Sequence, residues 1–374
     1  MIINTGQRTD IPAFYAEWFA NRLKAGSVCV RNPFDPQQVS RYRLDPEVVD
    51  VIGFCTKNPA PMLPYLDLLR DYGQIWHVTI TPYGRDIEPN VPDKRVVMEA
   101  FKKLSARVGS RACVWRYDPI LLLPGTPGPA SVGGTPGPAS VGGTSGPASV
   151  GGTPGPASVG GTSGPATVER NPGPATTGGI SIPGESGYSV QYHIEAFAQM
   201  AAELEGYTDT VVISFIDMYQ KVLRNFPEVR AVPMEQRREI AESVIRTAGE
   251  HGMTVRPCGE GTWMERYGAD CSGCNTIAMY ERAAGCRLTV PAFRPVREEC
   301  ACYLSCDIGA YDSCGHLCRY CYANRDAARV RSALENHDPA SPFLIGKEMP
   351  GDVIHDVPQQ SWVDRQISVF DVFE

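Results

Sequence analysis

Short apolar segments alternate along the chain with longer stretches in which every third or fourth residue is apolar. This alternation is typical of strands followed by helices, and it predicts an α/β fold with a parallel sheet or a barrel. The predicted strands are Met1–Asn4, Val48–Cys55, Ile75–Thr81, Ala112–Trp115, Thr210–Phe215, Thr254–Cys258 and Ser305–Tyr311. The predicted helices are Ala13–Lys24, Met62–Leu69, Pro92–Val108, Ile194–Leu204, Met234–Gly252 and Asn324–Asn336.

A low-complexity segment interrupts the alternation. From Gly125 to Glu169 a nine-residue unit close to GTPGPASVG recurs five times. Residues this small cannot bury enough apolar surface to offset the entropy lost on ordering. We therefore expect residues 124–187 to form a disordered insertion, explained by neutral expansion of the repeat rather than by a binding function.

Composition narrows the class of protein. The 374 residues are 43% hydrophobic, which is enough for a sizeable core, and the net charge of -7 gives no overall basic footprint for nucleic acid. The N-terminus does not resemble a signal peptide, and no apolar run is long enough to cross a membrane. We expect a cytoplasmic protein, in which the clustered cysteines among the 13 serve as metal ligands or catalytic groups rather than disulfides.

Three cysteines near the C-terminal end form the sharpest motif. Cys314, Cys318 and Cys321 have C-x3-C-x2-C spacing, with Tyr320 just before the last of them. Three thiolates on a tight loop can bind three corners of a [4Fe–4S] cluster, which leaves the fourth iron open to another ligand. The spacing favours such a cluster over zinc or free thiols.

This motif resembles the signature of the radical S-adenosylmethionine (SAM) enzymes. The resemblance implies a [4Fe–4S] cluster on Cys314, Cys318 and Cys321, SAM on the open iron, and Tyr320 near the adenine. In those enzymes the motif lies early in a (β/α) barrel, whereas here it lies about fifty residues from the C-terminus.

The displaced motif predicts a circular permutation. The strand, the cluster loop and their helix come last here, so Met1–Asn4 becomes the second strand in space. The expected fold is a circularly permuted, partial (β/α) TIM-like barrel of the radical SAM type. Its parts are residues 1–123 (first part of the barrel), 124–187 (insertion), 188–257 (second part), 258–306 (cysteine-rich), 307–336 (cluster strand, loop and helix) and 337–374 (a tail that packs on the barrel).

Five further segments resemble a bacterial family of unknown function, DUF1848. They are RTDIPAFY (8–15), TKNP (56–59), TPYG (81–84), WRYDP (115–119) and DIGAY (307–311), and with the cysteine motif they span nearly the whole chain except the repeats. That family is itself similar to radical SAM proteins such as spore photoproduct lyase. The resemblance implies a cofactor class but no particular reaction.

Charged residues follow several of the predicted strands. Because the active sites of β/α barrels lie at the carboxyl ends of the strands, these residues are expected to meet at one rim. The candidate catalytic residues are Arg8, Asp10, Lys57, Arg116 and Asp118, and the candidate cofactor-binding residues are Tyr320, Asp217 and Glu260. An arginine here could bind a carboxylate through two hydrogen bonds, and the acids could hold the ribose or amino group of SAM. The alternative is a lattice of ion pairs at the barrel mouth.

Cysteines upstream of the motif suggest a second metal site. Cys271 and Cys274 have C-x2-C spacing, Cys300 and Cys302 have C-x-C spacing, and Cys258 follows a strand, so at least the four ligands needed for zinc or an auxiliary cluster are available. The family resemblance favours Cys258, Cys274, Cys300 and Cys302. The cysteines expected to be buried apolar residues are Cys29, Cys55, Cys113 and Cys286.

The leading hypothesis is a radical SAM enzyme that acts on a small molecule or peptide, with an electron from a reductant such as flavodoxin or ferredoxin. A variant of it is transfer of the 3-amino-3-carboxypropyl group of SAM, as in a noncanonical enzyme type of arsenic-containing antibiotic biosynthesis to which the chain is similar. The other hypotheses are a non-enzymatic zinc-binding module and a nucleic-acid repair enzyme, the latter disfavoured by the acidic charge.

Overall fold

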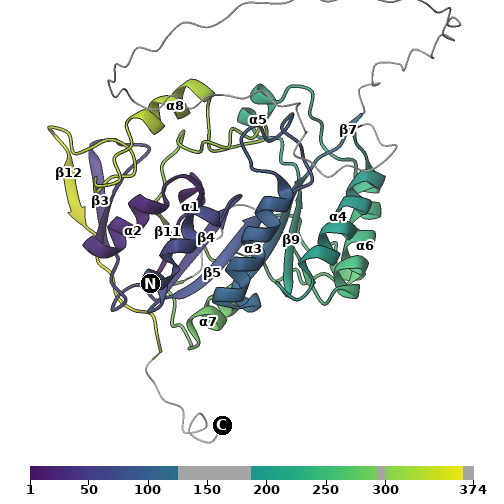
Figure 1. Cartoon of the computed structure of the whole chain (residues 1–374), viewed down its shortest axis with the longest axis horizontal. Coiled ribbons are helices and arrows are strands. Elements are labelled where there is room, and N and C mark those ends of the chain that lie inside the picture. The colour runs from purple at the N-terminus through teal and green to yellow at the C-terminus, as the bar shows by residue number, and fades with distance from the viewer. Residues whose placement is uncertain (125–186, 293–299, 301, 365–374) are drawn as a thin grey trace, which may run out of the picture. The chain divides into compact units, whose positions relative to one another are not determined.

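The computed structural model describes residues 1–124, 187–292, 300 and 302–364. Its centre is a seven-stranded sheet in which all six pairings are parallel (Figure 1). The strands are β1 (Ile2–Asn4), β4 (Val51–Thr56), β5 (Gly73–Thr79), β6 (Cys113–Ile120), β9 (Thr210–Phe215), β10 (Thr254–Pro257) and β11 (Cys306–Asp307). Each predicted strand is therefore present, and the α/β class is confirmed.

The order of the strands across the sheet is β10-β9-β6-β5-β4-β1-β11. The prediction that the N-terminal strand lies second is confirmed, because Ile3 pairs with Cys306 on one side and Ile52 on the other. Within the described residues, β10 and β11 pair on one side only, so the hydrogen-bonded sheet is open and does not close into a barrel.

Helices cover one face of the sheet (Figure 1). They are α1 (Ile11–Phe14), α2 (Ala16–Ala25), α3 (Lys94–Val108), α4 (Val190–Leu204) and α6 (Met234–Glu250), with the 3-10 helix η1 (Ala60–Leu69). The helix predicted over Ala13–Lys24 is broken at Tyr15, and the stretch at Met62–Leu69 is 3-10 with Pro64 inside. Proline lacks the backbone N–H that an α-helix needs, which accounts for the second difference.

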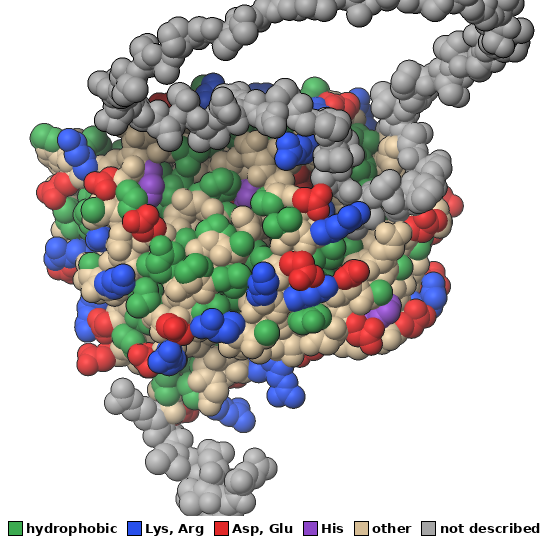
Figure 2. Space-filling model, in the orientation of Figure 1, with side chains coloured by type: hydrophobic (Ala, Val, Ile, Leu, Met, Phe, Trp, Pro, Cys, Tyr) green, Lys and Arg blue, Asp and Glu red, His purple; other side chains and the backbone are tan. Residues whose placement is uncertain are grey.

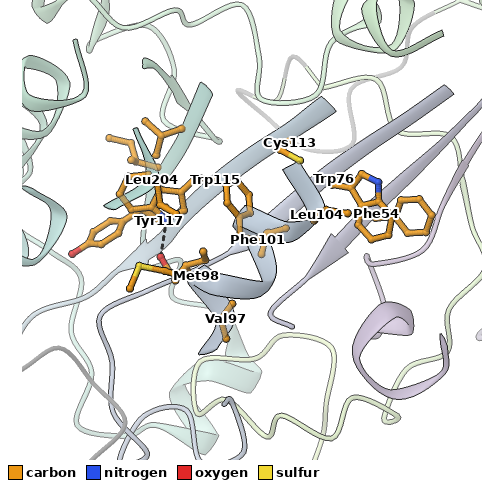
Figure 3. Close-up of a cluster of buried hydrophobic side chains, with 14 of the residues drawn as sticks. Phe54, Trp76, Val97, Met98, Phe101, Leu104, Cys113, Trp115, Tyr117 and Leu204 are labelled. Carbon is orange, nitrogen blue, oxygen red and sulfur yellow. Dashed lines mark hydrogen bonds between the residues drawn. The ribbon is translucent and has the colours of Figure 1, made fainter. Parts of the chain in front are cut away.

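The main core lies between this face and the helices. Phe54 stacks on Trp76 (Figure 3). Trp115 stacks on Phe197, and all four rings are at most 1% exposed. Residues that alternate with these along the strands point to the other face. On that face, residues near the starts of the strands form an apolar layer, which consists of Ile2, Val51, Ile75, Val114 and Val212.

Removing the Phe54 ring should be costly, because its centroid lies 3.7 Å from that of Trp76 in a fully buried stack. We expect Phe54→Ala to lower the free energy of unfolding by about 3–5 kcal/mol. Urea denaturation measures the loss. The exposed Phe34 provides a control, since Phe34→Ala should change the stability little. Equal effects of the two substitutions would contradict the assigned core.

The opposite face is covered at this apolar end by the cysteine-rich segment. Helix α7 (Ile277–Ala284), which the sequence did not predict, packs Met279 and Tyr280 against the apolar layer and contacts β5. The remaining helices are α5 (Gln220–Asn225), η2 (Ser110–Ala112), η3 (Glu265–Tyr267) and α8 (Ala327–Glu335). The other end of this face stays open, and that is where the cavity described below lies.

A small sheet was also missed. It joins β2 (Ser27–Arg31), β3 (Gln38–Arg43) and β12 (Val353–Asp356), so the tail pairs with an early hairpin. Farther along the tail, the Trp362 N–H donates to Asp50. The apolar run at the end of the tail falls within 365–374, outside the described residues.

The two sides of the insertion join in one sheet, because β6 pairs with β9. The chain next to the insertion forms a short antiparallel ladder between β7 (Leu123–Pro124) and β8 (Gly187–Tyr188), which holds its two ends together. The predicted disorder of the repeats concerns residues 125–186, outside the described part. Among the described residues, no helix is long and apolar enough to cross a membrane.

Candidate functional site

A cavity of about 740 Å³ opens at the carboxyl ends of the parallel strands. This volume suits a small-molecule ligand. Strand residues such as Asn4, Cys55, His77, Arg116 and Ser214 line it, because they alternate with residues that face the helices.

The cysteine loop forms another part of the lining, with Cys314, Cys318 and Cys321 all on the cavity. The loop is fastened to the rest of the chain by several hydrogen bonds. The Tyr15 hydroxyl donates to the Ser313 carbonyl at 2.6 Å, and the Asn90 side chain donates to the Gly315 carbonyl at 2.8 Å. The three thiols are therefore held on one surface by contacts that do not depend on a bound group.

Two residues inside the motif explain how the loop packs. A Cβ at Gly315 would lie 2.6 Å from the Phe14 ring, so only glycine fits there without displacement. His316 is buried, and its Nε2 lies 2.9 Å from Asp10 Oδ2. His316 therefore holds the loop in place through Asp10.

A buried charge network lies beside Cys318. Glu88 is fully buried, and it accepts hydrogen bonds from Lys57 Nζ at 2.8 Å, from Lys94 Nζ and from the Tyr320 hydroxyl. Burial opposes the charge on Glu88, but the two ammonium groups outweigh it and hold the pKa of Glu88 below its ordinary value. Two lysines and one carboxylate leave one net positive charge close to the cysteine loop.

This network gives Tyr320 a defined partner. Its hydroxyl is bound to Glu88, and Lys57 Nζ lies 5.4 Å from the centre of its ring. Tyr320 also lines the cavity. The hydroxyl anchors the motif to Glu88, and the side chain forms part of the cavity wall.

Burial raises the pKa of all three loop thiols, for Cys318 to about 12. Without a bound group they are therefore neutral at pH 7. Metals bind the thiolate, so loading this site with a metal or cluster releases protons.

The predicted rim charges meet at the cavity with one exception. Arg8, Asp10, Lys57, Arg116, Asp118 and Asp217 all line it. Arg8 pairs with Asp307 at 2.9 Å, and Arg116 pairs with Asp118. The exception is Glu260, which does not line the cavity: it accepts from the Phe215 N–H at 2.8 Å and from Arg237 at 2.9 Å. Glu260 joins two strands to helix α6 and is removed from the SAM-contacting candidates.

Asp10 connects three parts of the site. Its carboxylate accepts from the Ala13 N–H at the start of α1, from the Lys57 N–H at 2.7 Å and from His316. A capping role at a helix N-terminus is a structural function for such a residue. Asp10 therefore positions both the strand end and the cysteine loop.

The second group of cysteines lines the same cavity. Cys258, Cys274, Cys300 and Cys302 are all on its surface, and the Cys274 and Cys302 sulfurs are 2.9 Å apart. Cys271 and Cys306 pack against the helix-covered core instead. Cys55 also lines the cavity, so the expectation that it is only a buried apolar residue is wrong, whereas Cys29 and Cys113 are buried as expected. Cys286 is partly buried and packs against the apolar layer.

Several polar atoms on the cavity lining are buried without a hydrogen-bond partner. Of the eight such side-chain atoms among the described residues, six belong to lining residues: Asn4 Nδ2, Gln7 Nε2, Thr9 Oγ1, His77 Nδ1 and Nε2, and Asn275 Oδ1. An unpaired buried polar group costs about 1–3 kcal/mol, so such a concentration points to a ligand or ordered water in the cavity.

Sequence reasoning missed Glu88, Lys94, His77, Asn4 and Asn275. Asn4 and His77 could have been recognised from the sequence, because each is a polar residue inside a predicted strand. A buried polar side chain needs a hydrogen-bond partner, which can be a ligand. Glu88 lies in a turn-rich segment where an acidic residue is unremarkable, and no signal marked it.

The model of a family described as "Domain of unknown function (DUF1848)" matches residues 2–130 and 182–323, about 72% of the chain. The chain belongs to DUF1848. Searches of curated proteins and of solved structures each returned no match.

The DUF1848 match covers all seven strands of the parallel sheet and both groups of cavity cysteines. It leaves out residues 131–181, where most of the repeats lie. The cavity is thus built from the part of the chain that DUF1848 describes.

Proposed function

We propose that this protein is a radical SAM-type enzyme that uses a [4Fe–4S] cluster to cleave SAM reductively and acts on a small-molecule or peptide substrate. The observation that carries the proposal is the placement of Cys314, Cys318 and Cys321 on a cavity at the carboxyl ends of parallel strands. Three cysteines bind three irons of a cluster and leave one open, and that edge of the sheet is where β/α enzymes bind their substrates.

The residues present fit this cofactor. Three thiols from one loop reach a single cavity, and the cavity is large enough for a small molecule beside them. The unpaired polar atoms of Asn4, Gln7 and Thr9 supply hydrogen-bonding groups for a polar ligand. When bound, the cluster would supply the electron that breaks a carbon–sulfur bond of SAM.

The strand order supports the finer fold proposal, a permuted partial (β/α) barrel. Starting from β11, the neighbours across the sheet are β1, β4, β5, β6, β9 and β10, so each next strand follows in sequence once the C-terminal strand is counted first. The cysteine loop then follows the first strand and α8 comes after it.

The nucleic-acid alternative gains no support from Figure 2, where acidic and basic side chains are interspersed on the visible face.

The chain's own residues have separable tasks in this proposal. Tyr320 and Lys57 position the loop through Glu88, and the net positive charge of that network offsets the negative charge of bound thiolates. Arg116, held by Asp118, presents a guanidinium on the cavity that can bind a carboxylate. Asp217 lines the cavity and is retained as a candidate for the ribose or amino group of SAM.

The test is anaerobic. The protein is purified and reconstituted with iron and sulfide, then mixed with SAM and a chemical reductant or with reduced flavodoxin or ferredoxin. We expect a brown iron–sulfur absorbance and cleavage of SAM, with the products identified by mass spectrometry. Deoxyadenosine indicates hydrogen abstraction, and methylthioadenosine indicates transfer of the 3-amino-3-carboxypropyl group, for which an arsenical is one acceptor to try.

A folded sample that binds no iron and cleaves no SAM would contradict the proposal. Zinc in both cysteine groups would then identify a non-enzymatic metal-binding module.

A further inference from the structure

The four cysteines Cys258, Cys274, Cys300 and Cys302, here called the floor cysteines, form a compact group apart from the 314–321 loop. Cys258 follows β10, Cys274 follows a turn after it, and Cys300 and Cys302 come from the segment that returns to β11. All four line the cavity and pack in the apolar cluster of Ile2, Val51, Ile75, Val114 and Val212. Three separate pieces of chain thus bring thiols to one place.

Three of the four sulfurs, those of Cys258, Cys274 and Cys302, are linked by direct contacts. Cys274 Sγ and Cys302 Sγ are 2.9 Å apart, and the Cys258 thiol hydrogen-bonds to Cys274. Thiolates that share a tetrahedral metal at Zn–S of about 2.3 Å lie about 3.8 Å apart, so an opening of about 1 Å would admit an ion. No three thiol, imidazole or carboxylate groups in the described ranges already surround a common point, so these side chains must rearrange to hold a metal.

A positive charge accompanies the thiols. Arg116 Nη1 lies 3.9 Å from Cys274 Sγ, and the guanidinium is mostly buried beside Asp118. A divalent ion with four thiolates carries two net negative charges, which would be costly at a buried position without a nearby cation. Arg116 is placed to stabilise a thiolate on Cys274 by a hydrogen bond, and it shares its charge with Asp118.

Unpaired polar atoms lie at the same end of the cavity. Asn275, the residue after Cys274, and His77 lie close together, but neither Asn275 Oδ1 nor a ring nitrogen of His77 makes a hydrogen bond of good geometry. Desolvation lowers the pKa of His77 to about 3, so the ring is neutral. Such atoms indicate a ligand, an ion or ordered water at this end of the cavity.

We propose that the floor cysteines bind a second thiophilic metal, a zinc ion or an iron centre, separate from the cluster on the 314–321 loop. Soft thiolate ligands select zinc, copper(I) or iron–sulfur centres over magnesium or calcium. A metal here would fasten the cysteine-rich segment to the sheet face and so form one wall of the cavity. It would also link metal loading to the stability of that segment.

The test uses the full chain with Cys314, Cys318 and Cys321 all replaced by serine, which removes the first site. We expect this variant to retain about one zinc ion per chain, or iron with sulfide, as measured by elemental analysis and sulfide assay. X-ray absorption should then show sulfur ligands. The elemental analysis also shows whether the bound metal is zinc or iron.

A second measurement avoids variants that fail to fold. The metal-loaded triple variant is alkylated briefly under native conditions, and the modified cysteines are mapped by mass spectrometry. We expect the four floor cysteines to be protected relative to Cys286, which lies in the same segment and does not line the cavity, and to become reactive after chelation. Adding Cys274→Ser should abolish metal binding, whereas Cys286→Ser should not.

A folded triple variant that binds no metal, or whose floor cysteines react as fast with metal as without it, would overturn this proposal. The outcome is independent of the radical SAM proposal. If only the 314–321 cluster fails to form, the triple variant and the unchanged protein would hold the same metal.

Discussion

Replacing Glu88 by glutamine is expected to lower the free energy of unfolding by about 3–5 kcal/mol, because it removes the one carboxylate that compensates two buried ammonium groups. The Glu88 side chain is fully buried, and those of Lys57 and Lys94 are 13% and 4% exposed. Glutamine keeps the size of the side chain and removes only its charge. Urea denaturation followed by circular dichroism measures the loss.

Two control variants make this result specific. Glu88→Gln combined with Lys94→Met should recover part of the lost stability, because one of the two uncompensated charges is then gone. Asp67→Asn should cost little, since Asp67 pairs with Arg70 and Arg107 at the exposed surface. A loss below about 1 kcal/mol for Glu88→Gln would mean that the network is not a buried ion cluster.

The same network predicts how stability depends on pH. The pKa of Glu88 is lower in the folded than in the unfolded protein, where its ordinary value is 4.5. Its contribution is therefore fully present above pH 4.5 and is lost as the pH falls below that value toward the folded pKa. Between pH 3 and 7, the free energy of unfolding should change more steeply with pH for the unchanged protein than for Glu88→Gln. Parallel pH profiles of the two proteins would contradict the assignment.

Replacing Cys318 by serine is expected to abolish the iron–sulfur absorbance and the cleavage of SAM. The serine hydroxyl is a harder ligand with a much higher pKa, so it does not replace a thiolate on iron. Iron and sulfide content, absorbance and SAM products are compared after anaerobic reconstitution. The sheet should remain folded, because Cys318 lies on a loop at the cavity.

Cys29→Ser is the matched control for that experiment. Cys29 is buried in the small sheet with Val39 and Phe343 and does not line the cavity. It should keep its iron and its SAM cleavage even if its stability falls. Unchanged cluster content in Cys318→Ser would show that the iron is bound elsewhere, with the floor cysteines the first place to look.

The sequence predicted the parallel sheet well, for a physical reason. Strands buried on both faces are continuous apolar runs, as in Val51–Thr56 and Thr210–Phe215, and such runs stand out without any knowledge of their partners. The rim residues followed from the same strands, because the ends of parallel strands meet at one edge. Lys57 and Arg116 reach the cavity for this reason.

The small sheet could not be predicted in the same way. Val39 is the only buried residue of the strand Gln38–Arg43, and the partner strand Val353–Asp356 has no buried residue. Their pairing depends on contacts between positions more than 300 residues apart. Tertiary contact therefore decides these strands, and local pattern does not.

Single charged residues were harder still to assign. Glu260 follows a strand just as Lys57 does, yet it turns toward Phe215 and Arg237 and not into the cavity. The sequence indicates where a strand ends, but not in which direction the side chains that follow it point. Glu88 illustrates the opposite error, because it lies in an ordinary polar turn and its importance arises only when two lysines converge on it.

The pairing of β1 with β11 has a consequence for the order of events during synthesis. Ile3 emerges from the ribosome roughly 300 residues before Cys306, so one edge of β1 stays unpaired while nearly all of the sheet is made. The loop with Cys314, Cys318 and Cys321 is synthesised only after all seven strands of the sheet. Assembly of the proposed cluster would therefore be a late step that requires the finished sheet, and a chain that stalls early exposes an apolar strand edge.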